Sequence, residues 1–258
     1  MKTTLIVVSI LILCFAAWVL QNRDGKFYKK ATKMVRPFIA SIDIKNLNCK
    51  SYSGGFHDLV KSNTWQWYQP ELLSWELEGD KLNIQIVKEN VWWRNWRGPM
   101  FYTYIKGDID VCVTVQTRKA SNPDEYPDKA YQFGGLILRD PLGDKFCTSE
   151  HYIFNVVGYR GSKLTIETKS TSDGWSDVEG HDWPTGDAEL RIVRKGAIFQ
   201  LYARSMDEYV WQLMRTYDRP DLPETMQLGI IAYAYSEWSS YHDLKASFTN
   251  LSLNFPEK

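Results

Sequence analysis

From residue 65 onward, apolar side chains recur at every second position, and turn-forming residues interrupt them at strand-length intervals. Successive side chains of a β-strand point to opposite faces, so this spacing is typical of strands with one buried face, and long helical repeats are absent. The clearest strand is residues 108–118, in which Ile109, Val111, Val113 and Val115 share a face with Thr117. The pattern therefore predicts an all-β body.

About a dozen strands are expected, which is more than one twisted open sheet usually carries. We therefore expect an antiparallel two-sheet sandwich. Besides residues 108–118, the predicted strands are Leu72–Leu77, Leu82–Val87, Met100–Ile105, Tyr131–Arg139, Tyr152–Gly158, Lys163–Lys169, Ala188–Arg194, Ile198–Arg204, Val210–Arg215, Met226–Tyr233 and Leu244–Phe255.

The charge of the chain is unevenly distributed. The 258 residues hold 31 basic and 31 acidic side chains, but residues 1–36 contain seven basic residues and one acid, which leaves 24 basic and 30 acidic residues in the body. A body with a net charge of about −6 is a poor binder of polyanions, because phosphate neutralisation requires clustered Lys and Arg. Nucleic acid is therefore not an expected partner.

The N-terminus carries an uncharged run of 18 residues, Thr3–Leu20, close to the roughly 20 residues of a membrane-spanning helix. We predict a transmembrane anchor or signal segment over residues 1–21, and we favour a single-pass signal anchor that is not cleaved. The alternative is cleavage with Cys14 and Ala16 as the small residues of a signal-peptidase site.

Residues 22–38 combine apolar positions at helical spacing with five basic residues from Lys26 to Arg36. This pattern predicts a basic amphipathic juxtamembrane segment that contacts lipid headgroups, with a solvated linker as the alternative. The excess of Lys and Arg after the apolar run favours a cytoplasmic body, whereas a sugar-binding sandwich would be more familiar outside, so the side stays open. Residues 39–64 are expected to be a linker or an extra edge strand, and residues 65–258 the sandwich domain.

Several segments of the body together resemble the concanavalin A-like lectin/glucanase superfamily, and within it the regulation-of-enolase-like group of unknown function. They are Trp75–Ile86 with the turn Glu78-Gly79-Asp80, Trp92-Trp93, Gly107-Asp108-Ile109, Phe133–Asp140, Glu167–Thr171, Leu190–Gly196 and Leu228-Gly229-Ile230. The resemblance implies a jelly roll whose concave sheet forms a carbohydrate groove in sugar-binding relatives. These segments consist mostly of core and turn residues, so they specify the fold more than the function.

The catalytic motif of the superfamily's glucanases, Glu-x-Asp-x-x-Glu, is absent. The nearest sequence, Glu78 to Asn83, ends in Asn and reads as a hairpin turn. His57, His181 and His242 each precede an Asp, but neighbouring strand residues point to opposite faces, so these pairs predict no dyad or metal site. Asp173 and Asp177 make a weak calcium signal, for which a plain Asp-Gly turn is the better interpretation. No cofactor is expected, and the sequence leaves enzymatic activity uncertain.

The candidate ligand-binding residues are aromatic and polar. Indole rings stack on the C–H faces of sugars while carboxylates, amides and guanidinium groups bind hydroxyls, although packing is the competing role for each Trp. The candidates are Trp92, Trp93 and Trp96 in one polar stretch, Trp175 and Trp183 bracketing a predicted loop, and Arg139, Asn155 and Glu167 on the predicted polar face of the middle strands.

Three functions are compatible with this sequence. The first is a membrane-anchored, non-catalytic module that binds a carbohydrate. The second is a structural or regulatory domain that binds a protein at the membrane. The third, the least favoured, is a glycoside hydrolase or lyase with Glu167 as the acid/base.

Overall fold

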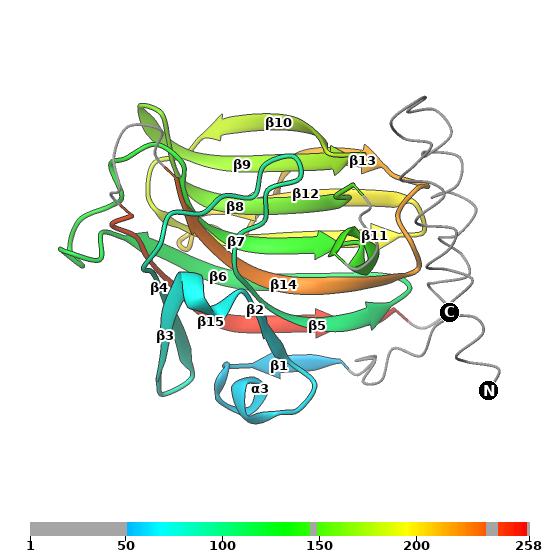
Figure 1. Ribbon diagram of the computed structural model, residues 1–258, viewed down its shortest axis with the longest axis horizontal. Helices are drawn as coiled ribbons and strands as arrows, with labels where there is room; N and C mark the ends of the chain where they lie inside the picture. Colours follow the sequence, from blue (N-terminus) through cyan, green and yellow to red (C-terminus); the bar gives the residue numbers. More distant parts are fainter. Residues whose placement is uncertain (1–50, 145–148, 236–241, 257–258) are drawn as a thin grey trace, which may run out of the picture. The chain divides into compact units, whose positions relative to one another are not determined.

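The structure is a computed structural model that describes residues 51–144, 149–235 and 242–256. As predicted, the body is all-β, with two antiparallel sheets (Figure 1). The strands are β1 (Tyr52–Gly54), β2 (Gln66–Tyr68), β3 (Leu73–Glu78), β4 (Lys81–Ile86), β5 (Met100–Lys106), β6 (Ile109–Arg118), β7 (Gln132–Arg139), β8 (Tyr152–Arg160), β9 (Lys163–Ser172), β10 (Trp175–Asp182), β11 (Asp187–Lys195), β12 (Ile198–Arg204), β13 (Gln212–Asp218), β14 (Thr225–Ala234) and β15 (Lys245–Asn254). The helical segments are α3 (His57–Lys61), η1 (Pro70–Leu72) and η2 (Pro141–Asp144).

Both sheets belong to one compact unit, residues 45–141 and 149–258. A second unit comprises Met1–Ile44 and Leu142–Thr148, of which the structure describes only residues 142–144. The eight-stranded sheet has the order β13-β12-β11-β6-β15-β4-β3, with β1 paired to β15. The seven-stranded sheet has the order β10-β9-β8-β7-β14-β5-β2. Many neighbouring strands are distant in sequence, so pairing between distant segments builds both sheets.

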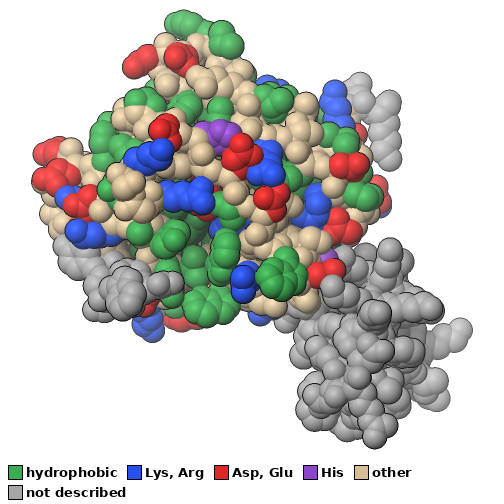
Figure 2. Space-filling model, turned by 90° about the horizontal axis from the view of Figure 1, so that it is seen from above, with side chains coloured by type: hydrophobic (Ala, Val, Ile, Leu, Met, Phe, Trp, Pro, Cys, Tyr) green, Lys and Arg blue, Asp and Glu red, His purple; other side chains and the backbone are tan. Residues whose placement is uncertain are grey.

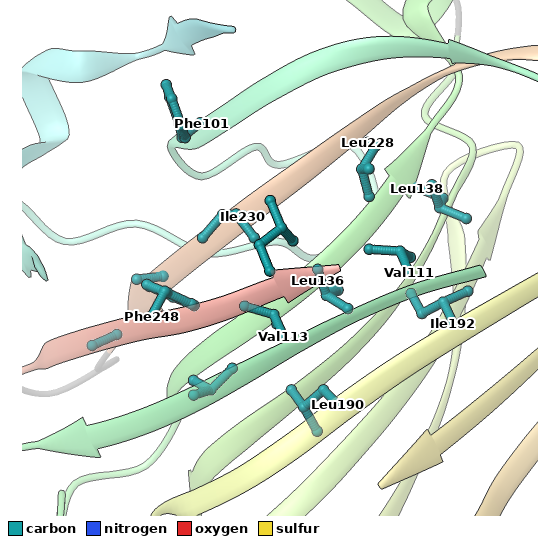
Figure 3. Packing of buried hydrophobic residues seen from close by; sticks show 14 of the residues in the cluster. Phe101, Val111, Val113, Leu136, Leu138, Leu190, Ile192, Leu228, Ile230 and Phe248 are labelled. Atoms are coloured by element: carbon teal, nitrogen blue, oxygen red, sulfur yellow. The ribbon is translucent and has the colours of Figure 1, made fainter. Parts of the chain in front are cut away.

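The hydrophobic core lies between the two sheets (Figure 3). The predicted inward face of β6 is confirmed, because Val111 and Val113 are fully buried and pack in this core. Leu136 and Ile230 enter it from the seven-stranded sheet, and Phe248 enters from β15. Burying each such side chain contributes about 1.5–3 kcal/mol to folding.

The predicted turn at Glu78-Gly79-Asp80 is confirmed as the connection between β3 and β4. Gly79 has a φ of 59° there, a left-handed conformation that glycine adopts without steric cost. Asp173 and Gly174, with φ values of 50° and 73°, form the turn between β9 and β10. The interpretation of this segment as an Asp-Gly turn is thus also confirmed.

The prediction of a loop between Trp175 and Trp183 is wrong, because residues 175–182 form the strand β10. β10 lies at the edge of the seven-stranded sheet, and most of its side chains are exposed or half-buried. An edge strand with two solvated faces needs no apolar alternation, so residues 175–182 show no strand pattern.

The predicted membrane anchor over residues 1–21 and the basic segment over residues 22–38 lie outside the described residues. Within residues 51–144, 149–235 and 242–256, no helix is long and apolar enough to span a bilayer. Of the cysteines, Cys112 is described and is a free thiol, and burial raises its pKa to about 12.

Candidate functional site

The seven-stranded sheet has two buried faces of opposite character. Its inner face carries the apolar side chains of the core. Its outer face, turned away from the other sheet, carries Arg139 of β7, Glu167 and Lys169 of β9, and Tyr233 of β14, none of which is more than 3% exposed. Side chains on the outer face of a sheet are buried only where another element covers them, so part of the chain must pack on this face. Charged side chains are rarely buried so completely unless they are paired, so partners are expected there as well.

That element is residues 87–99, which we call the strap. The strap connects β4 to β5 and crosses in front of the seven-stranded sheet in Figure 1. It contacts β14 where the Asn90 amide donates to the Ala234 carbonyl at 3.0 Å, and β10 where the Arg94 amide donates to Ser176 Oγ, also at 3.0 Å. The Asn95 side chain accepts from the Glu150 amide at 3.0 Å.

Trp92 is the apolar anchor of the strap. Its side chain is fully buried, lies edge-on to Tyr152 at 5.6 Å between ring centroids, and has the Arg139 guanidinium 5.8 Å from its own centroid. Its carbonyl accepts a 2.7 Å hydrogen bond from Lys169 Nζ. Gly98 packs so closely on the indole that a Cβ there would lie 2.8 Å from the ring. Trp92, a predicted ligand residue, therefore holds the strap on the sheet.

The outer face also holds a buried cluster of two arginines and one carboxylate. Arg139 and Glu150 are both fully buried and form two hydrogen bonds, of 2.7 and 2.8 Å. Arg97, from the strap, binds the same carboxylate at 2.5 Å. Arg139 also donates to Gln227 at 2.8 Å. Bidentate pairing of this kind fixes orientation as well as distance, and it joins strap, β7 and β14.

A second cluster centres on Glu167, whose carboxylate lies 3.4 Å from Lys169 Nζ and 3.5 Å from Arg160 Nε. Burial lowers the pKa of Lys169 to about 8, and the nearby Glu167 carboxylate offsets only part of this effect. Lys169 Nζ also lies 4.3 Å from the Phe154 centroid and 5.0 Å from that of Trp93. Burial, with the charge of Glu167, raises the pKa of Tyr233 well above its ordinary value.

Next to the strap lies a group of rings that we call the aromatic rim: the exposed Trp93, Trp96, Tyr131 and Trp175 and the half-buried Tyr235. Trp175 is 67% exposed and Trp96 is 59% exposed. Trp93 and Trp96 pair across a tight turn, and Trp96 lies edge-on to Tyr235 at 6.0 Å. The rim combines β10, the strap and the ends of β7 and β14, so residues distant in sequence form one surface.

The eight predicted ligand residues thus fall into two groups. Trp93, Trp96 and Trp175 are exposed together in the rim. The other five are buried: Trp92, Arg139, Asn155, Glu167 and Trp183. Trp183 packs in the core and donates from Nε1 to the Asp187 carbonyl at 2.9 Å.

The prediction that Asn155 lies on the same face as Arg139 and Glu167 is wrong. Asn155 points inward, and its side-chain amide donates to the Tyr202 carbonyl of the opposite sheet at 2.8 Å. The error arose because β8 is buried on both faces, so apolar side chains occur on both of them and alternation does not identify the inner one.

His151, to which the sequence analysis assigned no role, lies in a charged cluster. Its Nδ1 lies 3.1 Å from Asp221, and its Nε2 lies 3.4 Å from Asp173. Burial alone would raise the pKa of Asp221, but hydrogen bonds from Arg219 and His151 outweigh it and hold this pKa well below its ordinary range. No local sequence motif predicts this cluster, because its residues come from three separate loops.

The weak calcium signal is not supported by the positions of its carboxylates. Asp173 contacts His151, whereas Asp177 binds Arg215 of β13, in the eight-stranded sheet, at 2.6 Å. In the part of the chain that the structure describes, no three His, Cys, Asp or Glu side chains gather in a way that would hold a metal ion. Figure 2, which views the molecule of Figure 1 from above, shows acidic and basic side chains lying next to each other on that face.

Comparison with known proteins shows which solved structures share this fold. No family model and no curated protein matches the chain. A functionally unknown protein from Saccharomyces cerevisiae superposes with a TM-score of 0.61 at 18% identity, covering 76% of this chain and 98% of that one. The GH43 protein BlXynB from Bacillus licheniformis gives 0.58 at 13% identity, covering 82% of this chain and 39% of that one. The Lotus tetragonolobus seed lectin gives 0.53 at 10% identity, covering 80% and 97%.

The two-sheet topology and the lectin likeness together define a concanavalin A-like jelly roll, as the sequence resemblance implied. At these identities the likeness concerns the fold alone. The narrower assignment to the regulation-of-enolase-like group stays a prediction.

Proposed function

We propose that the chain is a non-catalytic binding module for a carbohydrate-type ligand, and that the ligand binds on the aromatic rim. One observation carries the proposal: three indoles, Trp93, Trp96 and Trp175, are exposed next to one another on the strap and β10. Exposed indoles bordered by polar side chains suit sugar rings, which present both C–H faces and hydroxyls. The lectin fold of structural neighbours is consistent with this role.

The buried carboxylates argue against a hydrolase. Glycosidases need two carboxyl groups about 5–10 Å apart that reach the scissile bond. Here Glu150 and Glu167 lie beneath the strap, each paired with two cations and no more than 3% exposed. Neither side chain meets a ligand while the strap is in place.

The proposal is tested by screening the purified full chain on a glycan array, with Trp175→Ala as the variant. Tyr209→Ala is the matched control, because Tyr209 is 93% exposed and lies on the distant β12–β13 connection. We expect Trp175→Ala to weaken binding about tenfold, equivalent to about 1.4 kcal/mol, and Tyr209→Ala to leave it unchanged. Equal binding by both variants would show that the rim is not the site.

A protein-interaction domain is the second candidate, favoured by the strap itself. The strap fills the outer face of the sheet with Trp92 and closes it to a sugar. This function would be supported if the full chain binds no glycan but binds a protein partner, and if Trp96→Ala no longer binds that partner.

We further propose that the N-terminus tethers the domain to a membrane. The uncharged run Thr3–Leu20 and the basic residues of 22–38 support this. A reporter enzyme that is active only outside the cytoplasm, fused after Lys258, tests the side. Activity in whole cells is expected for a domain that meets extracellular glycans, and silence from an expressed, folded fusion would place the domain in the cytoplasm and favour a protein partner.

A further inference from the structure

Arg94 lies at the centre of the exposed indoles. It is in the tight turn that pairs Trp93 with Trp96, has a φ of 53°, and is held by the bond from its amide to Ser176 Oγ. Its guanidinium carbon lies 4.8 Å from the Trp175 ring centroid and 5.7 Å from that of Trp93. The turn and the two rings thus present an exposed cation in a defined position.

Arg94 differs from every other arginine of the described residues in lacking an acceptor for its guanidinium. The other arginines bind carboxylates, or, in the case of Arg194, three backbone carbonyls. The carboxylate-bound arginines are Arg97, Arg118, Arg139, Arg160, Arg191, Arg204, Arg215 and Arg219. Within residues 51–144, 149–235 and 242–256, no carboxylate contacts Arg94. Its five N–H donors are therefore open to a ligand.

The carboxylates buried beneath the strap have cations of their own. Glu150 binds Arg97 and Arg139, and Glu167 lies next to Arg160 and Lys169. These two carboxylates are thus held by other cations, and the guanidinium of Arg94 remains available to an anionic ligand.

We propose that the ligand is an acidic glycan, in which a sugar carboxylate binds the Arg94 guanidinium and the adjoining ring stacks on Trp175. The planar fork of Arg matches a carboxylate with two parallel hydrogen bonds. The neighbouring indole supplies the apolar face that a sugar ring requires. This inference rests on the proposed carbohydrate function and adds the charge of the ligand to it.

The test uses glycans in matched pairs that differ only in charge: uronic-acid oligosaccharides with their methyl esters, and sialylated with desialylated oligosaccharides. We expect the full chain to bind the carboxylate member at least tenfold more tightly, and higher salt to weaken that binding. Arg94→Gln should abolish the preference, and Arg94→Lys should restore part of it, because Lys keeps the charge without the fork. Lys195→Gln, at an exposed cation at the end of β11, is the control and should retain it.

The outcomes separate this inference from the function on which it rests. Equal binding of the acid and its neutral partner, or an unchanged preference in Arg94→Gln, would overturn the acidic ligand and leave carbohydrate binding standing. Absence of binding to any glycan of either charge would overturn both. Thermal unfolding of each variant confirms that the comparison is made between folded proteins.

Discussion

The two faces of the seven-stranded sheet are buried by different means. On the inner face, Leu136 and Ile230 pack against apolar side chains of the eight-stranded sheet, and the contact depends on area and volume. On the outer face, Arg139 and Lys169 are covered by the strap and held by charged hydrogen bonds. The difference teaches that an apolar face tolerates substitutions of similar volume, whereas a buried charged face depends on each partner.

The largest effect is expected at Glu150. Glu150→Ala should destabilise the protein by about 3–5 kcal/mol, because it removes the carboxylate that binds the buried Arg139 and also takes a hydrogen-bond acceptor from Arg97. The free energy of unfolding is measured by urea titration.

The double variant Arg139→Met, Glu150→Leu is the control for this prediction. It removes both buried charges and keeps comparable volume, so we expect it to recover much of the lost stability, since apolar replacement of a buried pair is often neutral or better. A double variant as unstable as Glu150→Ala would show that the hydrogen bonds to the strap, and not the stranded charge, dominate this face.

An intermediate effect on stability is expected at Lys169, and this effect depends on pH. Its pKa of about 8 lies below the ordinary 10.5, so between these values the unfolded chain binds more protons than the native one, and stability attributable to this group rises with pH. At lower pH the charged amine opposes burial. Lys169→Met should lose this rise, and the gap in unfolding free energy between the two proteins should change by about 1.4 kcal/mol per unit of pKa shift.

The measurement is urea unfolding of wild type and Lys169→Met across this pH window. Lys195→Met, at an exposed position, serves as the reference for other titrations. Parallel pH profiles for wild type and Lys169→Met would contradict a buried, destabilised amine beneath the strap.

The smallest effect is expected at Arg215, whose pairs with Asp177 and Glu179 lie at the surface. Arg215→Ala should cost less than about 1 kcal/mol, because exposed ion pairs are weak and screened by salt. Thermal unfolding at low and high salt checks this. A loss as large as that of Glu150→Ala would contradict the distinction between buried and exposed pairs.

Much of the fold was predictable, and the failures share a cause. Strands with one buried face, such as β6, showed their alternation directly. β10 showed none, because it lies at an edge, and β8 misled about Asn155, because both of its faces are buried. Alternation reports whether one face is solvated, so it fails where both faces or neither face is buried.

The sequence predicted the residue types of the candidate site but not their arrangement. The Trp content of residues 92–96 and the isolated Trp175 marked aromatic groups suited to a sugar. In the structure Trp93, Trp96 and Trp175 are exposed, whereas Trp92 and Trp183 are buried. No local sequence pattern distinguishes the two groups. Exposure depends on what packs above a side chain, and here that is the path of the strap.

The sequence by itself determined an all-β sandwich with an apolar interior and a basic N-terminal segment, because alternation, turn residues and charge distribution are local properties of the chain. Only the tertiary structure decided that the strap closes the outer face, that Glu150 and Glu167 each serve two cations, and that Arg94 stands between two exposed indoles without a carboxylate among the described residues. These features join segments dozens of residues apart. Their geometry arises from sheet pairing and packing, which no local window of sequence contains.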